Sequence, residues 1–435
     1  MKLRSATAAA LLTGAACFCS PLAAAAQPAG ANYDEAKVGS LPLPDPLRFA
    51  NGAHVGDAGT WRDMRRPEIF RLFESQMHGR SPARPKEMTF EVTSTDKTAL
   101  GGKATRKEIT VHFGPEKVPG AAMHLLVYLP NGAKQPAPVF LGVNFEGNHT
   151  INPDPGITIV DEWKWNNTTK SSELTRPAES TRGKSIGRWP LELVLARGYA
   201  VATIPRADIE PDYAEGWRHG VRGYLLAKSG RSAFAPDDWG AVAAWAWGLS
   251  RALDYFETDK DVDAKRVVVM GHSRMGKAAL WAGAADERFA AVISNNSGES
   301  GAAISRRDFG ETVLRINTVF PHWFCANYKR YGTNVAALPF DSHMLVALSA
   351  PRPVYIASAE EDRWADPKGE FLAGKFAEPV YQLFGKRGLG VDEWPTLNYP
   401  VGDAIAYHVR TGKHDVLDYD WEQFMTFADR HLRRK

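Results

Sequence analysis

A glycine-flanked serine lies between an apolar run and a helical segment, and no other feature of the chain constrains the fold as strongly. The segment runs from Arg266 to Trp281. Gly271 lets the backbone pass closely and adopt torsion angles that a side chain would forbid, so Ser273 can hold a strained position with its hydroxyl exposed. The N–H groups that begin the following helix point to the same place and can stabilise a developing oxyanion. The pattern predicts a strand, a tight turn and a helix that present Ser273 as a nucleophile.

The turn departs from the common Gly-x-Ser-x-Gly pattern in two ways. The second glycine falls one position later, at Gly276. Arg274 and Lys277 also place two cations within one helical turn of the serine, where they oppose the helix dipole and so need a compensating use. The alternative is an ordinary buried turn with an incidental serine. Partners downstream in the expected order favour the nucleophile.

The first residues have the pattern of a secretory signal. Lys2 and Arg4 precede an apolar stretch at 6–19, and small residues follow up to Gln27. We therefore expect residues 1–26 to be a signal peptide and the protein to be periplasmic or secreted.

A lipoprotein anchored through Cys17 or Cys19 is the competing interpretation of the same segment. The residues at 14–16 lack the leucine expected three positions before such a cysteine. After the signal, no run approaches the roughly 18 apolar residues that cross a bilayer, so no membrane association is predicted.

Composition excludes several classes of protein. A chain of 435 residues with 44% hydrophobic residues can bury a substantial core. Loss of Lys2 and Arg4 takes the net charge from +3 to about +1, which is too near zero for a nucleic-acid-binding surface. Only Cys325 remains after the signal, so no internal disulfide is expected. No exposed apolar helix stands out, which leaves the oligomeric state open; a monomer is our expectation.

The chain divides into an arm and one catalytic domain. Residues 27–60 are rich in Gly, Pro and Asp without periodicity and predict an extended arm lying on the domain at 61–435. A first helix is expected at 65–78. Three strand-like runs follow, the last of which alternates enough to indicate an antiparallel edge, at 88–95, 105–113 and 122–129. A continuous apolar run at 138–144 predicts a strand buried on both faces.

Strand and helix signals alternate through the rest of the chain. Strands are expected at 199–204, 266–270, 290–294, 352–359 and 404–409, with helices at 190–196, 240–255 and 419–432. Repeated β-α units with apolar strands imply a mostly parallel sheet covered by helices on both faces. That is the α/β-hydrolase arrangement, in which function lies at the carboxyl ends of the strands.

A serine hydroxyl needs a base to take its proton and an acid to orient that base. Two histidines near the C-terminus compete for the first role. His414 falls in a loop after the last strand, where it can reach over the turn, whereas His408 lies within the strand itself. We favour His414 as the base and interpret His408 as a packed strand residue.

The acid is expected after the strand at 352–359, where three carboxylates stand together, Glu360, Glu361 and Asp362. Asp362 lies farthest beyond the strand end, and we choose it. The remaining histidines give no metal-ligand spacing: aromatic packing explains His322 and His343 better than zinc does. The residues predict a hydrolase without metal or cofactor, in which the backbone N–H and guanidinium of Arg274 stabilise the oxyanion.

Written Gly-His-Ser-Arg-Met-Gly-Lys, the turn resembles the signature Gly-Cys-Ser-Arg-x-Gly-Lys of the glucuronoyl esterases, carbohydrate esterase family 15. The resemblance extends from about Pro138 to the C-terminus. It implies an α/β-hydrolase that cleaves the ester between 4-O-methyl-glucuronoyl groups of xylan and lignin alcohols. It also implies that Lys277, Glu311 and Trp364 bind the uronate sugar, and that an acid after the late strand completes the triad, which matches Asp362.

Two departures from the family pattern concern the site. His272 replaces the signature cysteine, so the disulfide that fungal members form there cannot exist. Fungal members also place a glutamate acid where residues 295–297 now stand, and Asn296 cannot serve as a carboxylate. Glu299 is a nearby substitute but is displaced by three positions.

Tryptophans independently favour a sugar substrate, because flat aromatic faces beside polar groups suit sugar rings. Of 13 Trp, several are expected in irregular segments beyond strand ends, namely Trp163, Trp165, Trp217, Trp323, Trp364 and Trp394. Most are expected to be core residues, with Trp364 as the exception. The rival functions are an acetylxylan or other carbohydrate esterase, an inactive hydrolase fold that binds polysaccharide, and, less favoured, a secreted peptidase.

Overall fold

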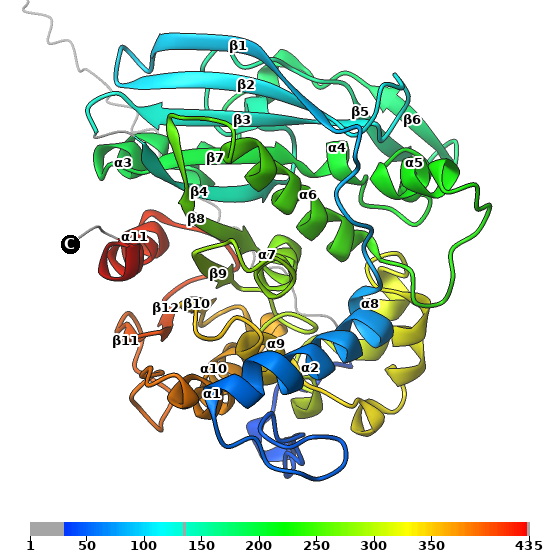
Figure 1. Ribbon diagram of the computed structural model, residues 1–435, viewed down its shortest axis with the longest axis vertical. Helices are drawn as coiled ribbons and strands as arrows, with labels where there is room; N and C mark the ends of the chain where they lie inside the picture. The colour runs from blue at the N-terminus through cyan, green and yellow to red at the C-terminus, as the bar shows by residue number, and fades with distance from the viewer. Residues whose placement is uncertain (1–29, 134–135, 433–435) are drawn as a thin grey trace, which may run out of the picture.

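The computed structural model describes residues 30–133 and 136–432, which form a ten-stranded sheet, a separate two-stranded sheet and helices on both faces of the large sheet (Figure 1). The proposed signal peptide at 1–26 lies outside the described residues. The strand order is β1-β2-β3-β7-β4-β8-β9-β10-β12-β11. β1, β2 and β3 pair antiparallel, as does β3 with β7, whereas the five pairs from β7 to β12 are parallel. The sheet is therefore mostly parallel, as predicted.

The strands of the large sheet lie close to the predicted residues, except β11, which was not predicted. They are β1 (Thr89–Ala99), β2 (Ala104–His112), β3 (Ala122–Pro130), β4 (Ala137–Asn144), β7 (Ala200–Pro205), β8 (Val262–His272), β9 (Ala291–Asn295), β10 (Val354–Ala359), β11 (Val401–Gly402) and β12 (Ile405–Arg410). Every residue of β4 is buried, as its continuous apolar run predicts. β8 begins earlier than predicted and carries its buried residues up to His272, directly before the turn at Ser273.

The α-helices are more numerous than the sequence predicted. They are α1 (Ala58–Thr60), α2 (Arg66–Phe73), α3 (Leu191–Ala196), α4 (Arg206–Ile209), α5 (Val221–Lys228), α6 (Ala241–Phe256), α7 (Arg274–Ala285), α8 (Val313–Val319), α9 (Ser342–Ala347), α10 (Pro367–Leu383) and α11 (Asp418–Leu432). α1 and α2 belong to one helical segment that extends from 58 to 78 through two π-helical stretches. The first helix therefore begins at Ala58, before the predicted start at Arg65.

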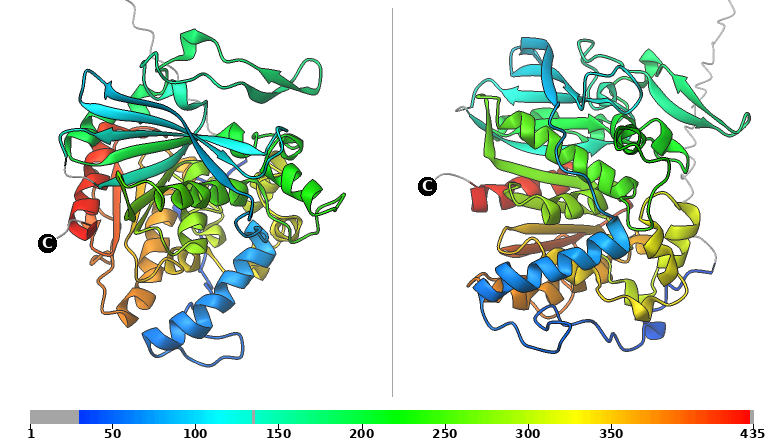
Figure 2. Two further views of the ribbon diagram at one scale, coloured as in Figure 1. Left: turned by 45° about the horizontal axis from the view of Figure 1, so that its top comes forward. Right: turned by 45° about the vertical axis from the view of Figure 1, so that its right-hand side comes forward.

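Two hydrophobic cores lie on opposite faces of the sheet. One contains buried residues of α2, α6, α7, α9 and α10, and the other contains those of α3 and α11. Figures 1 and 2 show α3 and α11 together on one side of the sheet and the larger group of helices on the other. All sixteen residues of α6 are buried, because its apolar residues surround the helix and it lies between the sheet and other helices. This packing holds the central strands β4, β8 and β9 rigidly.

One expectation about the tryptophans was wrong. Trp163 and Trp165 do not lie in an irregular segment but in β5 (Glu162–Asn166), which pairs with β6 (Ser171–Thr175) as an antiparallel hairpin outside the main sheet. Trp163 stacks on His219 with ring centroids 3.7 Å apart, and Trp165 lies 5.8 Å from Tyr213. The polar alternation of this hairpin gives no buried apolar run, which is why its strands were missed.

The described part of the N-terminal arm contacts the domain through several polar groups. Glu35 forms ion pairs with Arg307 at 2.6 Å and Lys368 at 3.1 Å, and the Gly310 N–H donates to the carbonyl of Asn32. The His343 ring donates from Nε2 to the carbonyl of Pro44. No helix among residues 30–133 and 136–432 is both long and apolar enough to cross a bilayer.

The turn between β8 and α7 permits no side chain at Gly271. A Cβ added there would overlap the carbonyl of Met275 and approach the amide of Gly276. The backbone of the helix start therefore lies directly against the end of the strand. This contact fixes where Ser273 stands at the carboxyl edge of the sheet.

We predict that Gly271→Ala destabilises the protein by about 1–3 kcal/mol, because the methyl group forces the strand and helix apart. The measurement is the free energy of unfolding in urea. Gly187→Ala is the matched control, since a Cβ at that position meets no atom within 4 Å, and a change within about 0.5 kcal/mol is expected there. Equal stability of the two variants would contradict the close-approach argument.

Candidate active site

Ser273 occupies a strained position between β8 and α7. Its φ of 58° and ψ of −131° lie in a region that residues with a side chain rarely adopt. The Ser273 N–H donates to the carbonyl of Asn295 at 2.8 Å, and the Ser273 carbonyl accepts from the Gly276 N–H at 2.8 Å. The hydroxyl does not cap the helix that it precedes. The backbone is thus held from both sides, and the hydroxyl is left available.

A cavity of about 290 Å³ opens beside the serine. Its walls contain all seven residues predicted for the site and six others: Ser273, Arg274, Lys277, Glu311, Asp362, Trp364 and His414, with Asn296, Ser297, Gly298, Phe320, Trp323 and Ala365. These residues come from the carboxyl ends of β8, β9, β10 and β12 and from the segment around α8. The fold thus brings together side chains that are separated by up to 141 positions.

His414 and Asp362 form a hydrogen-bonded pair in this cavity. Nδ1 of His414 lies 2.6 Å from Oδ2 of Asp362, and the Asp362 side chain is 6% exposed against 40% for His414. A carboxylate accepts a hydrogen bond from the Nδ1–H group, so Nε2 of His414 carries the lone pair. Of the neighbouring carboxylates, Glu361 is exposed and Glu360 is half-buried, whereas Asp362 is buried. Asp362 is the one that meets the imidazole.

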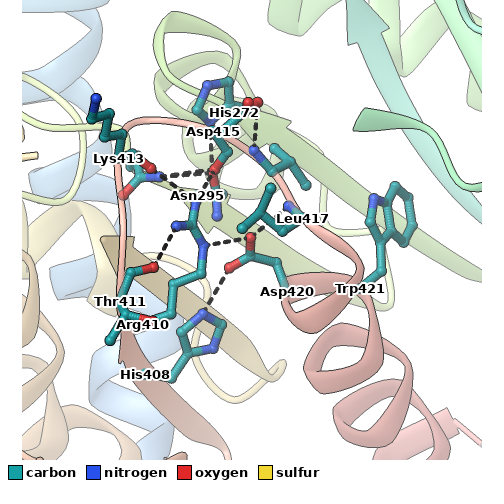
Figure 3. A network of polar contacts seen from close by, with 12 residues as sticks. His272, Asn295, His408, Arg410, Thr411, Lys413, Asp415, Leu417, Asp420 and Trp421 are labelled. Carbon is teal, nitrogen blue, oxygen red and sulfur yellow. Dashed lines mark hydrogen bonds and ion pairs between the residues drawn. The ribbon is translucent and has the colours of Figure 1, made fainter. Parts of the chain in front are cut away.

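The loop that carries His414 is held by a buried arginine (Figure 3). Arg410 donates to the carbonyls of Thr411, Lys413 and Asp415 at 3.0, 3.1 and 2.6 Å. Its Nε donates to Oδ2 of Asp420 at 2.8 Å, and neither side chain is more than 2% exposed. One guanidinium therefore fixes backbone atoms on both sides of His414, and Asp420 balances its charge.

His408 lies at the base of the same network. Its Nε2–H donates to Oδ1 of Asp420 at 2.9 Å, and its Nδ1 accepts from the Tyr355 hydroxyl at 2.9 Å. The ring is fully buried within β12 and does not line the cavity. The structure therefore places His408 as a packed strand residue, as the sequence predicted.

His272 packs beside His414. The two ring centroids are 4.4 Å apart, and Nδ1 of His272 donates to Oδ1 of Asn295 at 2.6 Å. Burial, and then the nearby charge of His414, hold the pKa of His272 well below its usual range. His272 is therefore a neutral ring that supports His414 where the family signature has a cysteine.

The two residues considered for the alternative acid position have other partners. Asn296 lines the cavity, and its Nδ2 donates to the carbonyl of Asp415 at 3.2 Å, which ties the end of β9 to the histidine loop. Glu299 does not line the cavity. Its Oε1 accepts from the hydroxyls of Ser300 and Ser305 at 3.0 and 2.6 Å, and burial raises its pKa.

Lys277 and Glu311 form a buried pair in the cavity wall. Nζ of Lys277 lies 3.8 Å from Oε2 of Glu311 and donates to the carbonyls of Ser297 and Glu299, both at 2.5 Å. Burial lowers the pKa of Lys277 and raises that of Glu311, while the charge of each partner opposes the shift of the other. The Glu311 N–H donates to the carbonyl of Trp364 at 3.0 Å, so this carboxyl group and the Trp364 segment are fixed together.

Three residues around Arg274 were not predicted for the site, although Trp323 was among the tryptophans expected beyond strand ends. Phe320 and Trp323 line the cavity, and the Arg274 guanidinium lies 5.4 and 4.8 Å from their ring centroids. Asp212 forms an ion pair with Arg274 from the loop after α4. His322, which was expected to be explained by aromatic packing, also donates to Asp212, at 2.9 Å. The available signal for Asp212 was its place shortly after a parallel strand, where functional residues gather.

Comparisons with known proteins agree with this geometry. The family model described as glucuronyl esterase, fungi, matches residues 195–385. Carbohydrate esterase MZ0003, from an unknown prokaryotic organism, is 50% identical over 407 residues, which cover 94% of this chain and 93% of that protein. The solved glucuronoyl esterase from Solibacter usitatus superposes with a TM-score of 0.87 at 52% identity, over 92% of this chain and 100% of that chain.

A further solved relative is described as a promiscuous CE15 esterase from a marine bacterial metagenome. It superposes with a TM-score of 0.85 at 49% identity, over 93% of this chain and 100% of that chain. The sheet topology and the serine turn define an α/β-hydrolase, which confirms the predicted fold class. Within that class, the chain belongs to the glucuronoyl esterases, carbohydrate esterase family 15.

Within residues 30–133 and 136–432, no group of three or more His, Cys, Asp or Glu side chains is arranged so that it could hold a metal ion.

Glu370 supports the floor of the cavity from α10. Its Oε1 accepts from the Gly298 N–H at 2.9 Å and the Ser297 hydroxyl at 3.1 Å, and its Oε2 accepts from the Ser358 hydroxyl at 2.6 Å. Glu370 is fully buried without a cation hydrogen-bonded to it, and burial raises its pKa to about 8. Burial therefore favours the protonated form of this carboxyl group.

This raised pKa makes stability depend on pH. Between the ordinary value of 4.5 and about 8, the folded protein keeps a proton that the unfolded chain releases, so stability falls as pH rises through this window. Glu370→Gln resembles the protonated form and cannot titrate. We predict that the loss of unfolding free energy from pH 5 to pH 8 shrinks by more than about 1 kcal/mol in this variant.

Glu361→Gln, at an exposed carboxylate of the neighbouring loop, is the control and should keep the wild-type pH dependence. Urea unfolding at the two pH values measures both variants. An unchanged pH dependence in Glu370→Gln would show that Glu370 ionises normally in the folded protein.

Proposed function

We propose that the protein hydrolyses the ester between 4-O-methyl-D-glucuronoyl groups of glucuronoxylan and lignin alcohols. The observation that carries the proposal is one cavity that contains both a serine beside an Asp–His pair and a cluster of Lys277, Glu311 and Trp364. The first group is suited to acyl transfer. The second offers a cation, a carboxyl group and a flat ring, which suit the hydroxyls and the C–H face of a sugar.

In the proposed mechanism, Ser273 attacks the ester carbonyl while Nε2 of His414 takes the hydroxyl proton. Asp362 keeps the Nδ1 proton in place and stabilises the imidazolium that forms. His414 then returns the proton to the departing alcohol, which leaves a glucuronoyl ester on Ser273. Water, deprotonated by His414, attacks this acyl-enzyme and releases glucuronate.

We assign to Arg274 the stabilisation of the oxyanion in each tetrahedral intermediate. Its backbone N–H begins α7 directly after the nucleophile, and its guanidinium lines the same cavity. Fixed donors that point to a developing charge stabilise the transition state more than the ground state, and they lower the barrier for this reason.

We assign substrate selection to the side of the cavity that is lined by Lys277, Glu311 and Trp364. Because a uronate ester carries no charge on its carboxyl group, its hydroxyls are the groups that a buried cation and carboxyl group can bind. Trp364 is half-buried, so one part of its ring stays available for a sugar face.

A broader carbohydrate esterase, active also on acetyl esters of xylan, is the second candidate function. The observation that favours it is the 49% identity to a relative described as promiscuous. Turnover of benzyl glucuronate and of acetylated xylan by the same preparation separates the two candidates. Binding of xylan without cleavage of either ester would instead support an inactive polysaccharide-binding protein.

We also propose that the protein acts as a monomer in the periplasm or outside the cell, after removal of residues 1–26. The substrate, a plant cell-wall ester, is found outside the cell, and the apolar stretch after Lys2 and Arg4 has the pattern of a signal. N-terminal sequencing of the exported protein tests the cleavage site, and a lipid-modified Cys17 or Cys19 would contradict it.

We predict that Ser273→Ala lowers kcat on benzyl glucuronate by at least about 10⁴-fold, because the nucleophile is lost. Circular dichroism and steady-state kinetics measure fold and turnover. Ser232→Ala, at an exposed serine, is the control and should keep wild-type kcat. Substantial turnover by Ser273→Ala would exclude the acyl-enzyme mechanism.

Lys277 should separate sugar binding from ester chemistry. We predict that Lys277→Met lowers kcat/KM for benzyl glucuronate about 100-fold and for 4-nitrophenyl acetate less than about threefold, since only the first ester carries the sugar hydroxyls. Lys184→Met, whose side chain is 64% exposed, should affect neither ester. Equal losses on the two esters would contradict a role for Lys277 in sugar binding.

A further inference from the structure

Asp212 accepts hydrogen bonds from four side chains beside the cavity. Its Oδ2 accepts from Nη1 of Arg206 at 2.8 Å and from Nη1 of Arg274. Its Oδ1 accepts from Nε2 of His322 at 2.9 Å and from Nε1 of Trp323 at 2.7 Å. The carboxylate is 3% exposed and uses two acceptor positions on each oxygen. Its position is therefore determined by four donors.

The environment keeps Asp212 ionised. Burial by itself would raise its pKa, but the His322 hydrogen bond and the charges of Arg206 and Arg274 outweigh burial and hold the pKa well below its usual range. The ionised carboxylate forms an ion pair with Arg274. Arg206 and Arg274 therefore share one carboxylate.

Arg274 is fixed on two sides as a result. Asp212 holds one edge of the guanidinium, and Trp323 and Phe320 lie 4.8 and 5.4 Å from it. Trp323 and Phe320 are themselves stacked, with centroids 3.8 Å apart. A free arginine side chain carries about 2 kcal/mol of rotamer entropy, and this arrangement removes that freedom before substrate binds.

One donor of Arg274 has no partner. Its Nε is buried and makes no hydrogen bond to any of the residues that the structure describes. A buried N–H without an acceptor is costly. This donor belongs to a residue that lines the cavity directly after Ser273 in the chain.

We propose that Asp212 is a positioning residue for the hydrolytic reaction, which holds the Arg274 guanidinium where the ester carbonyl oxygen becomes negatively charged. Asp212 does not line the cavity, so it acts through Arg274 and not on the substrate. The proposal rests on the proposed function, because it takes Arg274 to be an oxyanion donor. It extends that function to a residue of the loop after α4, which connects Arg274 of α7 with His322 and Trp323, after α8.

Asp212 also connects His322 and Trp323 to the rest of the wall, so a substitution has structural effects as well. A double-mutant cycle separates the two roles, because a positioning effect disappears when the positioned group is absent. Asp212→Asn is the variant of choice. It keeps the shape of the side chain, but its NH₂ group donates and cannot accept a hydrogen bond, so it cannot serve all four donors.

The experiment measures kcat and KM for Asp212→Asn, Arg274→Ala and the double variant on benzyl glucuronate and on 4-nitrophenyl acetate. We expect Asp212→Asn to lower kcat about tenfold on both esters with KM changed less than about twofold, because the oxyanion is common to both. In the Arg274→Ala background, the same substitution should lower kcat less than about twofold. The difference corresponds to a coupling of about 1 kcal/mol.

Asp238→Asn is the matched control. Asp238 likewise accepts from an arginine, Arg231, and from a backbone N–H, that of Ala235, but it lies outside the cavity. Its variant should keep wild-type kcat. If Asp212→Asn fails to fold, Asp212→Glu keeps the charge, displaces the carboxylate by one methylene, and should show the same dependence on Arg274.

The outcomes distinguish this proposal from the function on which it rests. Equal losses from Asp212→Asn with and without Arg274, or a loss on benzyl glucuronate alone, would overturn the positioning role while leaving the esterase mechanism intact. An Arg274→Ala variant with wild-type kcat would overturn the oxyanion role and the positioning role together. Full turnover by Ser273→Ala would overturn the mechanism itself.

Discussion

The strained backbone at Ser273 is the constraint on which the rest of the site depends. A serine with φ of 58° is unfavourable by itself and persists only when its surroundings determine it. Here the carbonyl of Asn295 binds its N–H, the start of α7 binds its carbonyl, and the absence of a side chain at Gly271 lets the helix approach the strand. The packing of β8 between β4 and β9, with α6 and α7 over one face, provides the rigidity that maintains this strain.

Around this turn, two buried charge clusters hold the two halves of the site. Arg410 and Asp420 fix the backbone on both sides of His414, and Asp212 fixes the guanidinium of Arg274. Buried ion pairs contribute little net stability, because desolvation offsets much of their attraction. Their benefit is geometric, since charge-assisted hydrogen bonds fix both distance and direction. The two clusters leave the base and the oxyanion donor little freedom relative to Ser273.

Much of the fold was predictable because its signals are local. The serine turn, the apolar run of β4 and the alternation of strands and helices after 190 correspond to observed elements and to the α/β-hydrolase class. α10 was missed because Pro379 lies inside it, and an internal proline normally indicates a helix end. The β5–β6 hairpin was missed because its strands are not buried, so no apolar period marks them.

The site residues were likewise predictable only where a local feature of the sequence marks them. Ser273, His414 and Asp362 were chosen from their order and from their place after strands, and all three line one cavity. The place of Asp212 and Trp323 beyond strand ends was visible in the sequence, but the contacts of Asp212, Phe320 and Trp323 with Arg274 exist only in three dimensions. The role of Arg410 is equally hidden, since a buried arginine at the end of a strand is indistinguishable in the sequence from an exposed one.

The central claim is that His414, oriented by Asp362, activates the hydroxyl of Ser273. Labelling by a fluorophosphonate, which reacts with activated serines, tests this most directly when the modified residue is mapped by mass spectrometry. The account predicts rapid modification of Ser273 in the wild-type protein, slow modification in Asp362→Ala and none above background in His414→Ala. Modification of a different residue, or equal labelling rates in the wild-type and His414→Ala proteins, would contradict it.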